Sequence, residues 1–581
     1  TRKARRGDAV VFADDGRDFY REQVLRTACM RGFAEEGLRV LDIGVAPTPA
    51  AVIYAAHIES RLVCVLTASH NPANQNGLKF FVDGFKLLPD GEVSDRVLTR
   101  EIIQLANDDA APTSRSRSQR MSAVRRSEGE DSLLASRRVF LQSGVPMLSL
   151  VPWQRSRVEI LFDASNGAGT VYGLDMLKKL GVRHRAINVH PDGANINAGG
   201  GVAEIEGHAA FHGQHRPADK LHMLPVVKHL ILRGRENGTR LWTVAIVLDG
   251  DGDRGYLLVY GPEYDTVYVI AGDALAYILA SIDARRGGLP LGATYVTTVE
   301  GDLMAPLAAE QNLGLKTLIT CVGDKWLTQP AREGGAIAAA AEDAGYVIKT
   351  QPVTTVNGGM RYVNTGNGLM TTLQVIGGVI TGEFPQDRVI QPFAMGFKQS
   401  AHTYFVDRAK FMPGTPVWRL TEQVIERQFR LARSQQTDPV WARLTLHKKH
   451  FDEDPSMLFY SLEEPGSPMV ASIFVRNSGT EIKTTINVRG QTAFFGVCHE
   501  ILEAVHAEHL KHLKDENSLE FAIERRVLLM LKKKGPVAPD RLLKILNIKR
   551  EVPFKQADLD AVMFALSKER RVRIAAKVAL V

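Results

Sequence analysis

The chain has 581 residues, of which 45% are hydrophobic and 24% charged, a composition that excludes a wholly disordered chain or a collagen-like repeat. Its net charge of +7 is carried entirely by the residues from Lys514 onward, where 16 basic residues face 9 acidic ones, so the remaining neutral body does not indicate a nucleic-acid-binding enzyme. The chain contains no apolar run of about 18 residues and no CxxC pair, which argues against a membrane span, a disulfide scaffold and a structural zinc site.

The N-terminal residues TRKARRGD lack the apolar segment of a secretory signal. The four scattered cysteines suit a reducing compartment. We therefore expect a cytoplasmic protein without membrane contact. A mitochondrial or other organellar matrix, reached with a transit peptide since removed, is the alternative.

Strands and helices alternate in the first predicted domain, residues 1–155. Strands are expected at 9–13, 38–44 and 61–67, and helices at 19–36 and 49–57. This alternation predicts a mainly parallel sheet covered on both faces. Residues 107–138, rich in Ser, Arg and Asp, predict a flexible surface insertion, for which an RNA-binding arm is the sharper alternative.

A polar loop follows the third strand of this domain. Ser69 stands at the strand end with His70 beside it and Lys79 ten residues on. A serine presented in this way can serve as a nucleophile or phosphate carrier, and a lysine can stabilise transferring phosphoryl oxygens. A simple turn rich in Asn and Pro is the alternative.

The second predicted domain, residues 156–262, carries the strongest chemical signal. Strands are expected at 158–163, 243–248 and 255–260 and a helix at 171–180, whereas the Gly- and His-rich stretch 199–238 predicts a long loop. Between the last two strands lie three alternating carboxylates with glycines between them, Asp249, Asp251 and Asp253. Oxygen ligands at this spacing suit Mg²⁺. An EF-hand calcium loop fits poorly, because its sixth and twelfth positions would be Arg254 and Tyr260, and an acidic turn without metal is the remaining alternative.

The third and fourth domains are predicted at residues 263–385 and 386–512. The third alternates strands and helices again. The fourth has strands at 471–475 and 484–488 and a helix at 494–513, and between the strands stands the sequence Arg476, Asn477, Ser478, Gly479 and Thr480. A guanidinium, two hydroxyls and glycine-permitted backbone amides can form an anion cradle, whereas a polar hairpin loop is the alternative.

The tail, residues 513–581, differs in kind. Helices at 519–533, 539–546 and 556–568 and a terminal strand pair predict a winged-helix-like basic extension. It could dock RNA or a protein through residues 514–581, or it could be a small packing domain.

Together the loops resemble those of the α-D-phosphohexomutase superfamily, which includes phosphoglucomutases, phosphomannomutases and phosphoglucosamine mutases. The resemblance covers about residues 9–512 in colinear order. The family's phosphoserine loop is similar to residues 67–72 with Lys79, and its metal loop to 249–254. Its sugar loop is similar to 342–346, preceded by 322–325, and its distal phosphate loop to 476–480.

The resemblance implies an α/β fold of four domains, three mixed α/β domains and an α+β C-terminal domain, with the tail added. It implies that Ser69 carries the phosphoryl group, that His70 and Lys79 assist, and that Mg²⁺ is held by Asp249, Asp251, Asp253 and Ser69. Hexose phosphate and hexose bisphosphate would be the ligands. The implied substrate-binding residues are Arg254, Lys325, Glu342, Arg476, Asn477, Ser478, Gly479 and Thr480.

Two hypotheses follow. The first is a phosphohexose mutase that moves a phosphoryl group between the 1- and 6-positions through a phosphoserine, with activity that is full or reduced. The second is a catalytically impaired protein of the same fold, kept as an assembly subunit that docks to RNA or a large complex through its tail. Ala344 and Tyr346 stand where the family's sugar loop usually has Ser and His, and the family's N-terminal Gly- and Arg-containing phosphate segment is not found before the first strand. Both departures favour the second hypothesis, and the complete Asp triplet favours the first.

Overall fold

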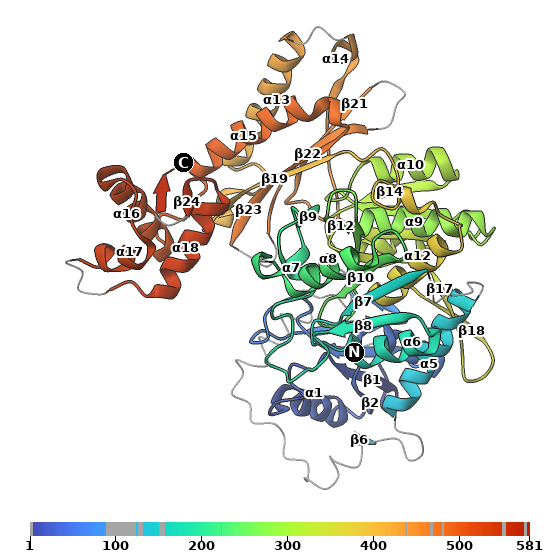
Figure 1. The fold of residues 1–581 in the computed structure, drawn as a ribbon. Helices are drawn as coiled ribbons and strands as arrows, with labels where there is room; N and C mark the ends of the chain where they lie inside the picture. Colours follow the sequence, from blue (N-terminus) through green and yellow to red (C-terminus); the bar gives the residue numbers. More distant parts are fainter. Residues whose placement is uncertain are drawn as a thin grey trace. The chain divides into compact units, whose positions relative to one another are not determined.

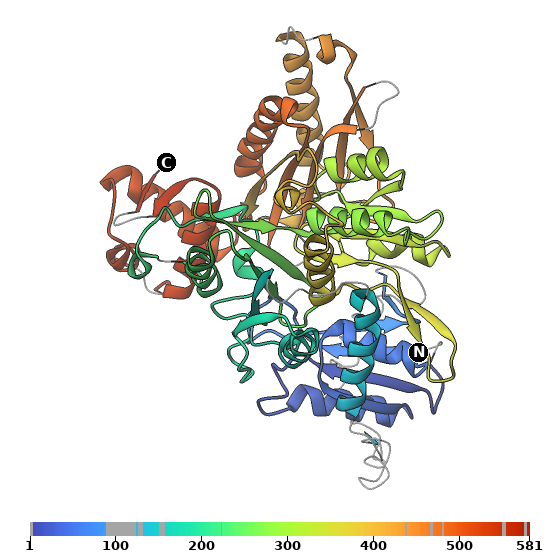
Figure 2. The same ribbon diagram turned by 45° about the vertical axis from the view of Figure 1, so that its right-hand side comes forward.

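The structure, a computed structural model, describes residues 4–88, 124–125, 132–149, 157–221, 223–435, 439–464, 469–478, 482–548, 553–574 and 578–580. The chain divides into two compact units (Figures 1 and 2). The first comprises Thr1–Gly301 and Ala305–Ala394, and the second comprises Asp302–Met304 and Met395–Val581. The finer division into five domains stays a prediction.

The first sheet of unit 1 has the strand order β5-β4-β3-β1-β2-β6. Strands β1, β2, β3 and β6 run parallel, and β4 and β5 complete the sheet in antiparallel fashion. The strands are β1 Ala9–Asp14, β2 Arg39–Val45, β3 Leu62–Leu66, β4 Leu78–Val82, β5 Phe85–Lys86 and β6 Val124–Arg125. The predicted parallel sheet is therefore present, and the loop with Ser69 joins its last parallel strand to its first antiparallel one.

The second sheet has the order β8-β7-β10-β11-β12-β9. Strands β8, β7 and β10 are parallel, and β11, β12 and β9 follow as antiparallel neighbours. The strands are β7 Val158–Asp163, β8 Arg183–Ile187, β9 Ala210–His212, β10 Trp242–Leu248, β11 Gly255–Gly261 and β12 Thr266–Ile270. All residues of β7 and β10 are buried, as expected for parallel strands covered on both faces.

The third sheet, in the order β14-β13-β15-β16, repeats the same pattern in smaller form. Its strands are β13 Thr294–Thr298, β14 Lys316–Thr320, β15 Ile337–Glu342 and β16 Tyr346–Ile348, and a separate hairpin pairs β17 Gln351–Thr354 with β18 Met360–Val363. In all three sheets the first strand lies between two parallel partners, and the third parallel strand leads through a loop into an antiparallel fourth. The loops after β3, β10 and β15 thus occupy equivalent positions. The first two contain Ser69 and the Asp triplet, and Glu342 is the last residue of β15, directly before the third loop.

Helices cover these sheets. In Figure 2, α5 runs beside the first sheet, where it packs against α2 and β2. The helices that begin before residue 395 are α1 Val24–Glu35, α2 Thr48–His57, α5 Ser132–Ser149, α6 Gly169–Leu180, α7 Val202–Ile205, α8 Pro225–Asn237, α9 Gly272–Arg285, α10 Met304–Leu313, α11 Gln329–Arg332 and α12 Gly368–Ile380.

Three sequence predictions for this unit need correction. The stretch 199–238 is not a loop throughout, because it contains α7, β9 and α8, whose Val226, Val227, Leu230 and Ile231 are buried at helical spacing. Helix α1 begins at Val24 instead of Phe19, after a turn that carries Arg17. The predicted insertion 107–138 lies mostly outside the described residues, but its last seven residues belong to α5.

Unit 2 is built on an antiparallel sheet in the order β19-β23-β22-β21-β20. One face packs on α13 and α15 through a core that includes Trp418, Phe429 and Ile501. The elements are β19 Phe397–Tyr404, β20 Thr445–Lys449, β21 Leu458–Glu463, β22 Met469–Asn477, β23 Lys483–Gly490, α13 Pro416–Gln435, α14 Pro439–Arg443 and α15 Phe495–His512. The predicted α+β domain is therefore present. Arg476 and Asn477 are the last residues of β22, and Ser478 follows them.

The tail forms α16 Leu519–Lys534, α17 Pro539–Leu546, α18 Gln556–Lys568 and the strand pair β24 Val572–Ile574 and β25 Val578–Leu580. These elements match the predicted three helices and terminal strands, whereas their assignment as a winged helix stays a prediction. The tail has its own apolar core, against which Phe405 of the neighbouring sheet also packs. Tyr404 stacks edge-on against Phe564, with ring centroids 6.0 Å apart. The tail is therefore packed onto the sheet domain and is not a detached appendage.

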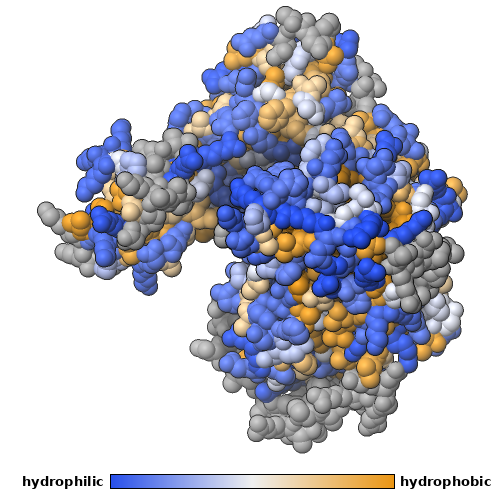
Figure 3. All heavy atoms as spheres, viewed as in Figure 1, coloured by the Kyte–Doolittle hydropathy of each residue, from blue (hydrophilic) through white to orange (hydrophobic). Residues whose placement is uncertain are grey.

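The surface drawn in Figure 3 carries mostly hydrophilic residues with smaller hydrophobic patches between them. Among the helices that the structure describes, none combines the length and apolarity needed to cross a membrane.

Candidate active site

Ser69 lies in a tightly held loop between β3 and β4. Its backbone has a φ of +54°, a left-handed conformation that non-glycine residues rarely adopt. The Ser69 amide donates to Thr67 Oγ1 at 2.8 Å, and that hydroxyl in turn donates to Asp15 Oδ2 at 2.6 Å. Ser69 Oγ donates to Asp249 Oδ2 at 2.6 Å. The serine hydroxyl is thus presented directly to the Asp triplet.

Arg17, which the sequence analysis did not single out, helps to hold this loop in place. Its Nη2 donates to the carbonyl oxygens of Ser69 and Asn71, at 2.7 and 2.6 Å. Asn197 Nδ2 donates to the same two oxygens at 2.8 and 3.0 Å. Asp15, 3.2 Å from Arg17 Nη1, compensates the buried guanidinium. The signal that could have found Arg17 is the polar run Asp14-Asp15-Gly16-Arg17 at the end of a buried strand.

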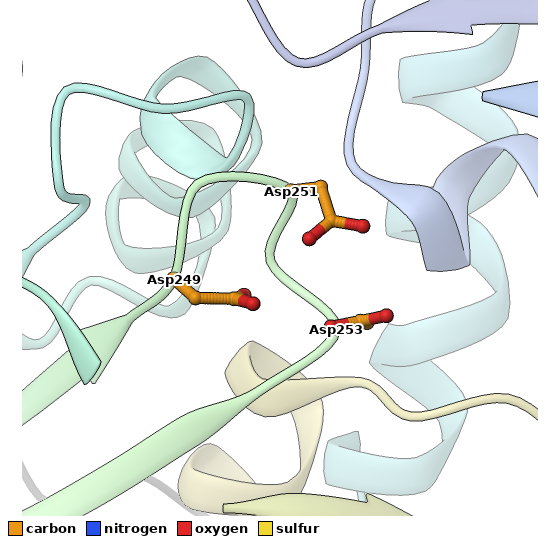
Figure 4. Close-up of side chains that lie close together, drawn as sticks. All are labelled: Asp249, Asp251 and Asp253. Carbon is orange, nitrogen blue, oxygen red and sulfur yellow. The ribbon is translucent and has the colours of Figure 1, made fainter. Parts of the chain in front are cut away.

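The Asp triplet forms a fully buried cluster between β10 and β11. One carboxylate oxygen from each of Asp249, Asp251 and Asp253 lies within 4.8 Å of the others, and Figure 4 shows the three side chains converging from one turn. Gly250 permits the turn to approach the serine loop, because a Cβ there would lie 2.7 Å from Ser69 O. The burial argues against the alternative of a solvated acidic turn, and the flanking strands are not the helices of an EF-hand.

Lys79 of β4 compensates part of this negative charge. Its Nζ lies 2.6 Å from Asp251 Oδ2 and 2.5 Å from Asp253 Oδ2. Burial alone would lower the pKa of Lys79, but the three aspartates raise it well above its usual value. Burial raises the pKa of Asp249, and its two neighbouring carboxylates raise it further. The aspartates therefore carry more negative charge than one lysine balances.

The donor set fits a divalent metal. Asp251 Oδ1 and Asp253 Oδ1 are buried and have no hydrogen-bond partner among the described residues. Buried oxygens left unpaired cost free energy unless something binds them. Carboxylate oxygens of this kind are the ligands that Mg²⁺ prefers, so the triplet could hold a metal ion together with Ser69 Oγ.

His70, beside the serine, is uncharged at neutral pH. Burial, together with the positive charges of Arg254 and Lys79, lowers its pKa to about 4. Its Nδ1 is buried and has no partner in the part of the chain that the structure describes. The neutral ring therefore keeps one nitrogen lone pair available.

The third equivalent loop, between β15 and β16, contacts the Asp loop directly. The Gly255 amide donates to Gly345 O at 2.9 Å, and Arg254 forms a β-bridge with Tyr346. Burial and Asp324 raise the pKa of Glu342 to about 7, against the opposing effect of Arg254. The structure thus brings Arg254 and Glu342 together beside the aspartates.

Tyr346 does not take the place of a sugar-facing histidine. It is only 3% exposed and belongs to an apolar core with Val296, Ala340 and Ile348. Gly366 makes room for its ring, since a Cβ there would lie 2.5 Å from Tyr346 Cε2. The replacement at this position is therefore a packing feature.

Lys325 lies in the segment after β14. Its Nζ is 5.9 Å from the centroid of the Trp326 ring. The preceding Asp324 accepts from Lys86 Nζ at 2.7 Å, which ties this segment to β5 of the first sheet. Asp324 is close enough to act electrostatically on Glu342 and Lys79.

The predicted phosphate clamp belongs to unit 2, at the turn between β22 and β23. Arg476 is half-buried and pairs with Thr485 across the sheet. The Asn477 amide donates to the carbonyl oxygens of Arg408 and Phe411, at 3.2 and 2.9 Å, so this side chain holds the loop. The Ser478 amide donates to Lys483 O at 2.9 Å, and Gly479 and Thr480 lie outside the described residues.

Comparisons with known proteins agree with this architecture. Residues 1–101 match the model of phosphoglucomutase/phosphomannomutase α/β/α domain I, and residues 271–391 match that of domain III. A phosphoglucosamine mutase of Saccharopolyspora erythraea is 28% identical over 62% of this chain and 67% of its own length, and one of an Arthrobacter species is 29% identical with the same coverage. A phosphoglucomutase/phosphomannomutase family protein of Burkholderia thailandensis shares the fold, with a TM-score of 0.54 and 18% identity over 88% of this chain and 91% of its own.

In two of its domains and in its fold, the chain is similar to proteins of the α-D-phosphohexomutase superfamily. Its matched relatives are named phosphoglucosamine mutases. They match 62% of this chain and 67% of their own length.

Proposed function

We propose that this phosphohexomutase moves a phosphoryl group between the 1- and 6-positions of a hexose phosphate through a phosphoserine at Ser69. The observation that carries the proposal is the hydrogen bond from Ser69 Oγ to Asp249 Oδ2 at 2.6 Å. A serine held in a left-handed turn against a buried acidic cluster has no evident structural purpose. Backbone strain of this kind is found where a side chain must be presented for chemistry.

The first transfer makes one bond and breaks one. A sugar hydroxyl oxygen attacks the phosphorus of phosphoserine, and the bond from phosphorus to Ser69 Oγ breaks. The hydroxyl proton passes by way of the neutral His70 ring to Ser69 Oγ as that oxygen leaves, so the serine is restored as a hydroxyl. The Lys79 ammonium compensates charge that develops on the oxygens. The bisphosphate then turns over and returns its other phosphoryl group to Ser69 Oγ, which restores the enzyme.

Mg²⁺ fits the buried cluster of Asp249, Asp251, Asp253 and Ser69, and when bound it would neutralise charge on the phosphoryl oxygens. Arg254, Glu342 and Lys325 are the proposed contacts to the sugar. The loop 476–480, with Arg476, is the proposed binding site for the phosphate that is not reacting. Because curated relatives are phosphoglucosamine mutases, glucosamine 6-phosphate is the first substrate to test.

The decisive experiment compares Ser69→Ala with Ser281→Ala, a half-buried serine whose hydroxyl donates to Tyr277 O on α9. Ser69→Ala should lose turnover and lose the phosphopeptide that contains residue 69. Its unfolding free energy should change by only about 1 kcal/mol, the typical net value of one hydrogen bond. Ser281→Ala should keep both the turnover and the phosphopeptide that contains residue 69. Turnover retained in Ser69→Ala would overturn the proposal.

The alternative of an impaired assembly subunit is not favoured, because the relatives are named as phosphoglucosamine mutases and the matched family model as phosphoglucomutase/phosphomannomutase. Docking of RNA or a protein to residues 514–581 and the cellular compartment both stay predictions.

A further inference from the structure

A second hollow lies on the sheet of the Asp loop, at the opposite end of its strands. It is a shallow hollow of about 560 Å³ that is open to solvent, and it is lined by His212, Gln214, Tyr264, Thr266 and Tyr268. Strands β9 and β12, which carry it, lie side by side in Figure 1. The Asp loop precedes β11 and the turn with Tyr264 follows it. Seven residues at about 3.4 Å each separate the two by roughly 20 Å, so the hollow is distinct from the catalytic loops.

The wall of this hollow is held in a strained backbone conformation. Gln214, His215 and Asp265 have φ values of +53°, +53° and +47°. Non-glycine residues in this region are uncommon, and three of them at one wall require the surrounding structure to hold them. Strain of this kind gathers at binding and switch sites.

Asp265 is the group that holds the wall. Its fully buried carboxylate accepts from the His215 amide at 2.7 Å, from Tyr260 Oη at 2.9 Å and from Arg235 Nη2 at 2.6 Å. The Gly213 amide donates to Asp265 O at 2.8 Å, and a Cβ on Gly213 would lie 2.4 Å from Asp265 Oδ2. The negative charge of Asp265 is thus compensated by donors within the wall and does not face a ligand.

Two tyrosine rings also line the hollow. Tyr268 lies over Gly261, where a Cβ would come within 2.7 Å of its Cε2, so the absence of a side chain there makes room for the ring. Tyr264 is 64% exposed at the rim. An exposed aromatic ring beside a half-buried one offers an apolar surface that a flat ligand face can cover.

The polar atoms of the hollow are neutral. The Thr266 hydroxyl donates its one proton to Tyr264 O at 2.8 Å, so it must accept from His212 Nδ1–H at 3.0 Å. His212 Nε2 then presents a lone pair. The Gln214 amide makes no hydrogen bond to another described residue and offers both a donor and an acceptor. The lining contains no lysine or arginine.

We propose that this hollow binds a neutral carbohydrate, whose apolar ring face covers the tyrosines while its hydroxyls bond to His212 Nε2 and the Gln214 amide. Pockets for such ligands combine aromatic walls with a few fixed polar groups. A phosphorylated sugar has no cationic partner among the lining residues. The hollow therefore selects an uncharged ligand, whereas the catalytic loops are proposed to bind a phosphorylated one. This proposal does not depend on the proposed function.

The test is calorimetric titration of the full chain with N-acetylglucosamine and, separately, with glucosamine 6-phosphate. The neutral sugar should bind, and the double variant Tyr264→Ala/Tyr268→Ala should weaken that binding by about tenfold or more, as loss of aromatic anchors does. Tyr362→Ala, which removes a tyrosine of matched exposure at 63% from the β17–β18 hairpin, should not change it. Mutase turnover should be the same in all three proteins.

A further variant separates this proposal from the proposed function. Ser69→Ala should retain neutral-sugar binding whether or not it retains turnover. His212→Ala should weaken binding without altering turnover. Absence of neutral-sugar binding would overturn the proposal, as would binding that the tyrosine variants leave unchanged or that glucosamine 6-phosphate displaces.

Discussion

At the scale of single residues, one ammonium group faces the buried aspartates. The Lys79 side chain is 14% exposed, whereas the side chains of Asp251 and Asp253 are 0% and 2% exposed. Removal of one partner from a buried ion pair leaves an uncompensated charge. The ammonium and a metal ion would therefore stabilise the same oxygens.

Lys79→Met tests this overlap. We expect the variant to lose about 3–5 kcal/mol of unfolding free energy, since uncompensated buried carboxylates remain. Added Mg²⁺ should restore more stability to the variant than it adds to the unaltered protein. Lys86→Met, which removes a less buried ion pair with Asp324, is the control. Equal Mg²⁺ effects in both variants would contradict the shared role.

The site residues were predictable to different degrees. Ser69, Lys79 and the Asp triplet follow strand ends, and their types alone indicate phosphoryl and metal chemistry. Arg17 acts on Ser69 and Asn71, which are more than fifty residues away in the chain. The polar run that ends in Arg17 could mark this residue as a candidate, but its contact with the serine loop depends on which strands become neighbours.

At the scale of elements, the β15–β16 hairpin shows how packing decides a residue's role. Tyr346 stands in a loop that is similar to a sugar loop, yet its ring lies in the core with Leu327 and Ile337. Helix α8 gives the converse case. Its buried apolar residues follow a Gly- and His-rich segment whose composition hid the helix, although the 3.6-residue spacing was present.

Tyr346→His should therefore lower the unfolding free energy more than it changes mutase activity. An imidazole without a partner in this core costs about 1–3 kcal/mol, in addition to the lost ring volume. Tyr346→Phe keeps the ring and loses only the hydrogen bond between the hydroxyl and the Gly366 backbone, so it should lose about 1 kcal/mol at most. Chemical denaturation measures both. A gain of mutase activity in Tyr346→His at unchanged stability would place this side chain at the sugar after all.

Helix α15 carries a pH-sensitive group in the core of unit 2. His509 is fully buried, and its Nε2 donates to Thr421 Oγ1 at 2.9 Å, because that hydroxyl donates to Val417 O. Burial lowers the pKa of His509 to about 3, with smaller contributions from His506 and His512. The unfolded chain therefore binds a proton at a higher pH than the folded chain does.

The sign of the effect follows from this difference. The stability that His509 contributes is complete above pH 6.5 and falls as the pH drops from 6.5 toward 3, by up to about 1.4 kcal/mol per pH unit. His509→Gln should flatten this dependence for unit 2 between pH 6.5 and 4.5. His512→Gln, an exposed position on the same helix, should not. Denaturant titrations at a series of pH values distinguish the two.

At the scale of the whole molecule, three sheets share the same order of four strands, and each carries one of the three proposed catalytic loops. The sequence predicted the alternating elements and the order of the motifs. It did not predict the equivalence of the three sheets, because strand order depends on which buried faces meet, and the three segments share no obvious residues. The two antiparallel strands added at the edge of the second sheet, which form the wall of the second hollow, were also not predicted.

A buried ion cluster within the tail lies where the tail contacts the sheet domain. Lys514 Nζ lies 2.8 Å from Glu524 Oε2 and 2.6 Å from Glu569 Oε1, and Glu569 also accepts from the Tyr404 amide at 2.8 Å. Lys514→Met should destabilise unit 2 by about 3–5 kcal/mol. Lys511→Met, which removes an exposed pair with Glu508, should cost no more than about 1 kcal/mol. Similar losses in the two variants would show that the tail folds without this junction.

The equivalence of the three loops has an evolutionary consequence. In a chain built from repeats of one module, each copy can carry a separate function, and one function can then change while the others are conserved. If Glu342 contacts the sugar as proposed, mutations in the β15–β16 hairpin should shift the preferred sugar, because the proposed donor serine and the acidic cluster are anchored in other copies. New specificities in this family should therefore arise from exchange of the third module alone, and a chimaera that carries the β13–β16 segment of a relative should inherit its sugar preference while keeping its own phosphoryl donor.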